Sequence, residues 1–318
     1  MPIPTELMNL SNNSIAALQR LVNYQTPPDT FPMKRRAAVM VGLFASRNGH
    51  LNVLLTKRSP TMRTYAGQTA LPGGKMEIDD VDLEHTARRE AYEECGLTRN
   101  SKKVRRLAML TPFLSRGYLI VTPVVCFITD QTLMPRLNSR EVDVLFSHRL
   151  EQFLGHQDLS EPDAPSATTI PMETPSESSA FPRSSVMEHP YLRSYENHWF
   201  SQRIPCRYFE FESKVSPIVG FTANILIETA QIAYGREPNF ERYAKGQWTM
   251  KDLIELALEE ASEFKNDDQA KTVDHHNLLE DRKDDDELGS GLFSKLDVSY
   301  YFENLYKKLS QLYPRSKL

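Results

Sequence analysis

The sequence predicts an α/β protein in which helices and strands alternate over roughly its first 240 residues. Residues 36–46 and 51–58 are apolar segments joined by a turn that contains Asn48 and Gly49, a pairing typical of a β-hairpin. Residues 11–24 place apolar side chains at helical spacing behind Asn and Ser caps. A third segment, preceded by several Asp residues that can cap a helix and ended by Gly96, is also typical of a helix.

The remaining pattern continues this alternation towards the C-terminus. The expected strands are 104–113, 119–129 and a pair within 199–211, and residues 138–142 open a further extended segment. The expected helices are 148–154, 217–235, 249–264 and 294–312.

Composition excludes several broad classes of protein. A net charge of −4 over 318 residues argues against a nucleic-acid-coating protein, which would be basic, so no nucleic-acid partner is expected. Three scattered cysteines do not form a disulfide framework, which favours a reducing compartment. No apolar run reaches the length of about 18 residues that spans a bilayer, and the N-terminal residues do not resemble a secretory signal. We therefore expect no membrane association.

Three carboxylates form the most informative cluster. Glu90, Glu93 and Glu94 stand at positions i, i+3 and i+4, and these positions share one face of a helix. Like charges at this spacing repel each other, whereas a hard cation such as Mg²⁺ or Mn²⁺ makes the arrangement favourable. The plainer alternative is a solvated acidic helix face, which is the usual explanation for a lone run of this kind.

The residues around the cluster resemble the Nudix box, G-x5-E-x7-R-E-U-x-E-E-x-G-U, in which U is a bulky apolar residue. Gly74, Arg89, Glu90, Glu93 and Glu94 match this pattern, as do Gly96 and Leu97. Asp80 stands where Glu is expected, one extra residue separates it from Arg89, and Ala91 replaces a larger apolar residue. The resemblance implies an α/β/α sandwich with a mixed sheet and a bound Mg²⁺ or Mn²⁺ held by Glu90, Glu93 and Glu94.

A basic segment leads directly into this box. Between Lys57 and Met76 there is no acidic residue, and arginine is well suited to bind phosphate oxygens. The alternative is an ordinary surface loop. The segment resembles the signature of coenzyme A diphosphatases, LLTxRSx3Rx3Gx3FPGG, with Leu71 in place of the phenylalanine. The residues on which this resemblance places substrate binding are Lys57, Arg58, Ser59, Arg63, Gly67, Gly73 and Gly74.

The resemblance implies hydrolysis of the diphosphate of coenzyme A or acyl-coenzyme A to 3′,5′-ADP and 4′-phosphopantetheine. Arg89 would orient Glu93, and the general base would be either Glu93 or Glu141, the latter in an N-x-x-E-V segment similar to one in this family. Two alternatives remain open at this point. One is a Nudix hydrolase that acts on NADH, ADP-ribose or an oxidised nucleotide, and the other is a non-catalytic Nudix-fold module that only binds nucleotides.

The sequence divides into three expected parts. Residues 1–30 form an N-terminal helical segment, residues 31–240 form the Nudix domain with a Ser- and Pro-rich disordered insertion at about 156–190, and residues 241–318 form a helical and acidic extension. The last three residues, Ser316, Lys317 and Leu318, match a tripeptide that the peroxisomal import receptor reads at a free C-terminus. The expected location is therefore the peroxisomal matrix.

Overall fold

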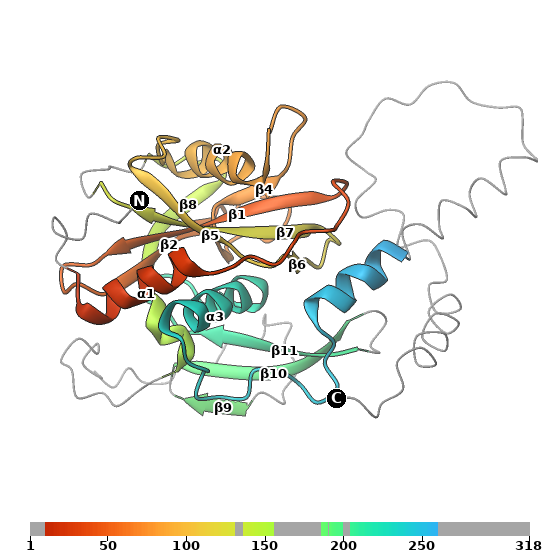
Figure 1. Cartoon of the computed structure of the whole chain (residues 1–318). Coiled ribbons are helices and arrows are strands. Elements are labelled where there is room, and N and C mark those ends of the chain that lie inside the picture. Colours follow the sequence, from red (N-terminus) through yellow and green to blue (C-terminus); the bar gives the residue numbers. More distant parts are fainter. Residues whose placement is uncertain (1–9, 131–135, 156–185, 190, 200–203, 260–318) are drawn as a thin grey trace, which may run out of the picture.

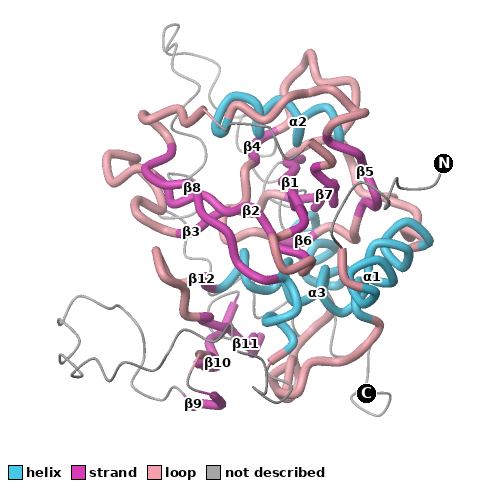
Figure 2. Tube along the Cα trace, turned by 90° about the vertical axis from the view of Figure 1, so that its left-hand side faces the viewer, coloured by secondary structure: helices cyan, strands magenta, loops and turns pink. Residues whose placement is uncertain are grey.

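The computed structural model describes residues 10–130, 136–155, 186–189, 191–199 and 204–259. Within these ranges, an eight-stranded mixed sheet is covered by helices on both faces, as Figures 1 and 2 show. Its strands are β1 (Arg36–Ala45), β2 (Leu51–Arg58), β3 (Thr69–Ala70), β4 (Gly73–Lys75), β5 (Val104–Met109), β6 (Phe113–Leu114), β7 (Ile120–Ile128) and β8 (Val142–Arg149). The expected α/β/α sandwich is confirmed.

The order β3-β2-β1-β7-β5 forms the spine of the sheet, with β8 paired to β2. Strands β1 and β7 are parallel, and all other pairs are antiparallel. The strands β1 and β2 pair only at their hairpin end, where Leu43 faces Val53. At the other end of β1, β4 takes the neighbouring position, and Ala38 pairs with Gly74. The sheet therefore opens between β1 and β2, and the Gly-Gly strand fills the start of that opening.

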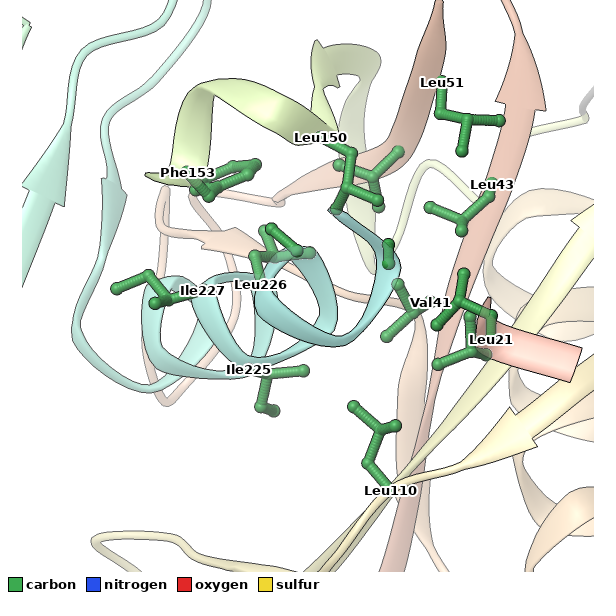
Figure 3. Close-up of a cluster of buried hydrophobic side chains, with 14 of the residues drawn as sticks. Leu21, Val41, Leu43, Leu51, Leu110, Leu150, Phe153, Ile225, Leu226 and Ile227 are labelled. Atoms are coloured by element: carbon green, nitrogen blue, oxygen red, sulfur yellow. The ribbon is translucent and has the colours of Figure 1, made fainter. Parts of the chain in front are cut away.

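Both faces of β1 and β7 are apolar because each is covered. Met40 and Val124 point towards helix α2 (Leu83–Cys95), whereas Val41 and Val125 point towards α1 (Asn12–Asn23) and α3 (Gly220–Tyr234). Burial on both faces explains why these strands read as continuous apolar runs instead of alternating ones. Figure 3 shows the side chains of the second face, where Leu21 of α1 and Leu226 of α3 meet Val41 and Leu43.

A second sheet adds a layer of which the sequence predicted only a part. It has the order β12-β11-β10-β9, with β9 (Val186–His189), β10 (Leu192–Trp199), β11 (Ile204–Phe211) and β12 (Ile218–Val219). The strand pair expected within 199–211 is β11 together with a partner, β10, that ends where that range begins. Helix α3 lies between the two sheets (Figure 1), and Phe209 and Phe211 of β11 belong to the same buried cluster as α3. The residues 250–259 form one more helix, whose Leu253 and Ile254 pack against Leu114 and Ile120.

Several expected boundaries are wrong, and each has a local cause. The helix expected from 217 begins at Gly220, because Ile218 and Val219 instead pair with β11. The short helix expected from 148 is a 3₁₀ helix, Leu150–Leu154, because β8 stays paired with β2 as far as Arg149. The strand expected at 104–113 stops at Met109 before Pro112, which has no N–H to donate.

Some expectations fall outside the described residues. These are the insertion over 156–185 and 190, the acidic stretch and helix after residue 259, and the terminal tripeptide. The final part of the expected insertion is corrected, since residues 186–189 form strand β9. The expected helix at 249–264 is described as far as residue 259. No helix in the described ranges is long and apolar enough to cross a membrane.

The ring of Phe153 connects the main sheet to the second one, which makes it a test of this layered packing. It is fully buried, and its centroid lies 4.9 Å from those of Phe211 and His148. We expect Phe153→Ala to lower the free energy of unfolding by about 3–5 kcal/mol, because it removes buried apolar surface and leaves a cavity. Denaturant titration gives this value. The exposed Val22→Ala provides the control, and a loss below about 1 kcal/mol for Phe153→Ala would contradict the packing described.

Candidate active site

Helix α2 is held at both ends by the residues that the sequence marks as caps. The carboxylate of Asp82 accepts a hydrogen bond from the backbone N–H of His85 at 2.7 Å. Gly96 ends the helix in the left-handed conformation at φ 67°, which favours glycine. Between these caps Glu90 and Glu94 face the sheet and Glu93 stays half exposed.

The glycines of β4 let α2 approach the sheet closely. A Cβ atom on Gly74 would overlap the Glu90 carboxylate and lie 2.6 Å from its Cδ, and a Cβ on Gly73 would lie 2.7 Å from the Cα of Val39. The backbone of Gly73 also lies near the Glu94 carboxylate and opposes the rise of its pKa. Both glycines that the sequence marked are therefore required by the contact between β4, β1 and α2.

The carboxylates of Glu90 and Glu94, which face the sheet, have too few positive charges nearby to balance their own. Burial and, after it, the nearby Glu90 raise the pKa of Glu94 to about 8, although Arg58 opposes the rise. Burial also raises the pKa of Glu90, with Arg89 opposing and with Glu93 and Glu141 adding to the rise. A cation placed between Glu90 and Glu94 would relieve this repulsion, since desolvated carboxylates gain most from an added positive charge.

The guanidinium of Arg89 connects α2 to the segment before it. It donates to both carboxylate oxygens of Asp80 at 2.9 and 3.0 Å, and to the carbonyl oxygen of Lys75 at 3.0 Å. It also donates to Glu90 at 3.0 Å and reaches Glu93 at 3.4 Å. One buried cation therefore fixes the loop, strand β4 and two of the three box carboxylates.

Asp80 is the buried counterpart of Arg89. Its carboxylate accepts from Arg89, from the hydroxyl of Thr86 at 2.9 Å and from the backbone N–H of Glu77 at 2.9 Å, and it lies 2.9 Å from His85 Nδ1. The guanidinium of Arg89, together with these donors, holds the pKa of Asp80 well below its usual range. The Asp that departs from the box pattern thus has a definite place, although its side chain is one methylene shorter than Glu.

The segment after β7 brings Glu141 to the same region. The backbone N–H groups of Arg136 and Asn138 donate to the carbonyl oxygens of Cys95 and Glu94, which caps the C-terminal end of α2. The carbonyl of Glu141 accepts from the N–H of Ser59 at 2.8 Å, and its charge acts on Glu90 and Glu94. Both candidate bases, Glu93 and Glu141, therefore lie at this site.

The basic segment divides between the two faces of the sheet. Arg58 follows Leu54 and Thr56 on the α2 face, and its Nε is buried with no hydrogen-bond partner among the described residues. Lys57 lies on the opposite face and pairs with Asp143 at 3.3 Å. The structure thus brings Arg58 to the carboxylates and turns Lys57 away from them.

The other residues of the segment shape the loop between β2 and β3. The buried hydroxyl of Ser59 lies 2.8 Å from that of Thr61, and Gly67 adopts a left-handed conformation at φ 71°. Arg63 lies at the exposed part of this loop. Sequence reasoning placed these residues beside the box, and the structure puts them on the loop that enters β3 and β4.

No compact set of three or more His, Cys, Asp or Glu ligands is assembled within the described ranges. Glu93 instead points to Arg89 and, at 3.5 Å, to Arg99. The available donors nevertheless fit Mg²⁺ or Mn²⁺, because Glu90, Glu94 and Glu141 supply oxygen atoms only and two of these carboxylates are desolvated. A metal at this place would be held by Glu90 and Glu94, with Glu93 joining on release from its arginines.

The residues of this site lie within a stretch that matches a known protein family. The family profile described as the NUDIX domain matches residues 33–168. A protein of Arabidopsis thaliana, "Nudix hydrolase 15, mitochondrial", is 36% identical over 216 residues, which cover 67% of this chain and 63% of that protein. A peroxisomal coenzyme A diphosphatase of Saccharomyces cerevisiae is 35% identical over 44% of this chain and 50% of its own length.

A third relative is a peroxisomal coenzyme A diphosphatase of Mus musculus. It is 37% identical over 120 residues, which cover 38% of this chain and 49% of that protein. This chain therefore spans about half to two thirds of the length of each of these three relatives.

The Asp80–Arg89 pair gives a test that needs no substrate. We expect Asp80→Asn to lower the free energy of unfolding by about 3–5 kcal/mol, because it leaves the buried Arg89 without its main anion. Asp79→Asn is the matched control, since Asp79 is exposed. Chemical denaturation of both variants measures the difference. Equal stability of the two variants would mean that Asp80 does not anchor Arg89.

Proposed function

Because this chain contains a NUDIX domain, we propose that it hydrolyses the diphosphate bond of coenzyme A and its acyl derivatives with the aid of Mg²⁺ or Mn²⁺. The proposal rests on one observation: two carboxylates without enough positive charge and an arginine without a hydrogen-bond partner lie at the same site. Glu90 and Glu94 are carboxylates with raised pKa values, and Arg58 has a buried donor without a partner. A metal–diphosphate group would satisfy both, because its cation meets the carboxylates and its oxygens meet the arginine.

The proposed roles follow from the positions of the side chains. The metal would be held by Glu90, Glu94 and Glu93, and when bound it neutralises the diphosphate and lowers the pKa of a water molecule. Arg58 donates to a diphosphate oxygen on the α2 face, and Arg63 lies on the loop that continues from it. Arg89 keeps Glu90 and Glu93 in place through contacts of 3.0 and 3.4 Å.

The proton of the attacking water goes to a carboxylate of this site, either Glu93 or Glu141. Glu93 is half exposed and shares Arg89 with Glu90, so a proton taken there can pass to solvent. Glu141 stands on the segment that caps α2 and acts on both buried carboxylates. Replacing each by Gln in turn assigns the base, because the loss of a general base removes one limb of the pH–rate profile.

Two relatives support coenzyme A as the substrate, since the matched proteins of yeast and mouse carry the name coenzyme A diphosphatase. The Arabidopsis relative bears only the general name Nudix hydrolase. A panel of coenzyme A, an acyl-coenzyme A, NADH and ADP-ribose, each incubated with Mg²⁺, decides between these substrates by chromatography of the products. We expect 3′,5′-ADP and 4′-phosphopantetheine from coenzyme A. Faster cleavage of NADH or ADP-ribose would mean that coenzyme A is not the preferred substrate. No cleavage of any of the four compounds would favour a module that only binds nucleotides.

The role of Glu94 is tested by Glu94→Gln, which keeps the shape of the side chain and removes its charge. We expect the variant to fold and to lose at least about a hundredfold in turnover, the scale expected when a group that stabilises the transition state is removed. Steady-state assays with coenzyme A measure the loss. Glu84→Gln is the control on the same helix, because Glu84 pairs with Arg88 and Arg106 on another side. Near-normal turnover by Glu94→Gln would remove Glu94 from the site.

The proposed location is the peroxisomal matrix, reached through an import receptor. Two relatives are named as peroxisomal, whereas the Arabidopsis relative is named as mitochondrial. The tripeptide Ser316-Lys317-Leu318 lies outside the described residues. We expect an N-terminal fluorescent fusion to overlap a peroxisomal marker and the same fusion without Leu318 to be diffuse. Identical patterns for the two fusions, or overlap with a mitochondrial marker, would contradict this location.

A further inference from the structure

Four segments that are far apart in the sequence converge around the start of α3. The hydroxyl of Ser216 donates to the carbonyl of Gly67, and that of Thr222 donates to the carbonyl of Thr69. These bonds tie the β2–β3 loop to the start of α3. A Cβ atom on Gly220, the first residue of α3, would lie 3.3 Å from the ring of Tyr208 in β11. The guanidinium of Arg116, from the β6–β7 turn, lies over the same ring at 5.1 Å.

Arg116 rests on a fixed aromatic support. Tyr208 stacks against Tyr195 of β10, with centroids 5.7 Å apart and ring planes 11° apart. The indole N–H of Trp199 donates to the hydroxyl of Tyr208. Both tyrosines are buried, whereas Arg116 is exposed. The second sheet therefore holds a guanidinium at a defined place on the surface, which a long exposed side chain does not achieve alone.

Backbone strain gathers at the same place. Among the described residues, only Arg35, Tyr65 and Tyr118 have a positive φ without being glycine, at 60°, 55° and 56°. Arg35 donates to the carbonyl oxygen of Gly117 at 3.5 Å, and Tyr118 is two residues after Arg116. The phenol of Tyr65 acts on the charge of Arg116. Such conformations are costly for bulky side chains, and they concentrate at ligand sites.

The two arginines at this place have no anionic partner. Within the described residues, neither Arg35 nor Arg116 lies within ion-pair distance of a carboxylate, whereas their neighbour Arg36 pairs with Asp29. Both guanidinium groups are exposed, and the ring of Tyr65 is 53% exposed. Two unpaired cations beside an exposed aromatic ring are suited to a ligand that carries both a negative group and a flat ring.

The start of β1 connects this place to the box carboxylates through β4. Glu90 packs on Gly74, which pairs with Ala38, and Arg35 lies three residues before Ala38 on the same chain. The backbone from Ala38 to Arg35 therefore spans at most about 10 Å. Along this stretch β4 occupies the edge of β1 that β2 leaves free, because β1 pairs with β2 only from Leu43 onward.

From this arrangement we infer that Arg35, Arg116 and Tyr65 form a subsite for the phosphorylated nucleoside end of the substrate. The ring of Tyr65 stacks on the base, and the two guanidinium groups bind a phosphate on the ribose other than the diphosphate that is cleaved. The inference rests on the proposed function, for which that group is the 3′-phosphate of coenzyme A. Its residues extend the site beyond the box, and their support in β10 and β11 lies outside the matched residues 33–168.

Direct binding tests the subsite without relying on turnover. Isothermal titration of the full chain compares adenosine 3′,5′-bisphosphate with adenosine 5′-monophosphate. We expect the intact protein to bind the bisphosphate more tightly, and Arg35→Gln and Arg116→Gln each to weaken that binding roughly tenfold, with little change for the monophosphate. Arg193→Gln, an exposed arginine of the second sheet, is the matched control. Arg116→Lys, which keeps the charge, is expected to retain part of the preference.

A second measurement separates this inference from the proposed function. With coenzyme A and dephospho-coenzyme A as substrates, we expect the two Gln variants to raise KM for coenzyme A and to leave both kcat and the values for the dephospho form nearly unchanged. A chain that hydrolyses neither substrate would contradict the proposed function, and the titrations would still test the subsite. The inference is overturned if the intact chain does not prefer the bisphosphate, or if both variants keep that preference. Equal weakening for both nucleotides also overturns it, because the arginines would then act through the fold.

Discussion

The guanidinium of Arg89 is the contact on which the geometry of the site depends. It is buried, and it donates to Asp80, to the carbonyl of Lys75 and to Glu90 at once. Without a cation at this place, the carboxylates of α2 would lose their charge balance and β4 would lose its link to the helix. The close approach that Gly73 and Gly74 permit desolvates both carboxylates, and this burial outweighs the opposing charge of Arg89 at Glu90 and of Arg58 at Glu94. The site is thus built with an excess of negative charge.

The contacts of Arg89 explain why Asp80 can stand where the box pattern has Glu without disturbing the fold. Asp80 is shorter than the expected Glu, but it is reached by Thr86 and His85 as well as by Arg89. The extra residue between Asp80 and Arg89 allows Asp82 to cap the helix while Asp80 turns inward. The sequence could reveal the spacing but not these bonds, because they depend on the path of the loop between β4 and α2.

Local patterns predicted the parts of the fold that are fixed by local physics. The Asn48-Gly49 hairpin, the capped helix α2 and the two-sided apolar strands β1 and β7 follow from turn chemistry, capping and burial. Of the second sheet, only β11 lies within the strand pair that was expected at 199–211. Its partner β10 ends where that range begins, β9 lies in the stretch that was expected to be a disordered insertion, and Ile218 looked like the first turn of a helix. In the site, the sequence analysis did not separate Arg58 from Lys57, whose side chains point to opposite faces of the sheet. The alternation of neighbouring side chains along a strand could have predicted this difference.

Glu90 and Glu94 form a negative site that is suited to bind a divalent cation. Mn²⁺ titration followed by electron paramagnetic resonance measures this most directly, because free and bound Mn²⁺ are counted separately and no substrate is needed. We expect the intact chain to bind Mn²⁺ and Glu90→Gln to weaken this binding by roughly tenfold or more. Unchanged Mn²⁺ binding in Glu90→Gln, with its fold intact, would show that Glu90 does not bind the cation.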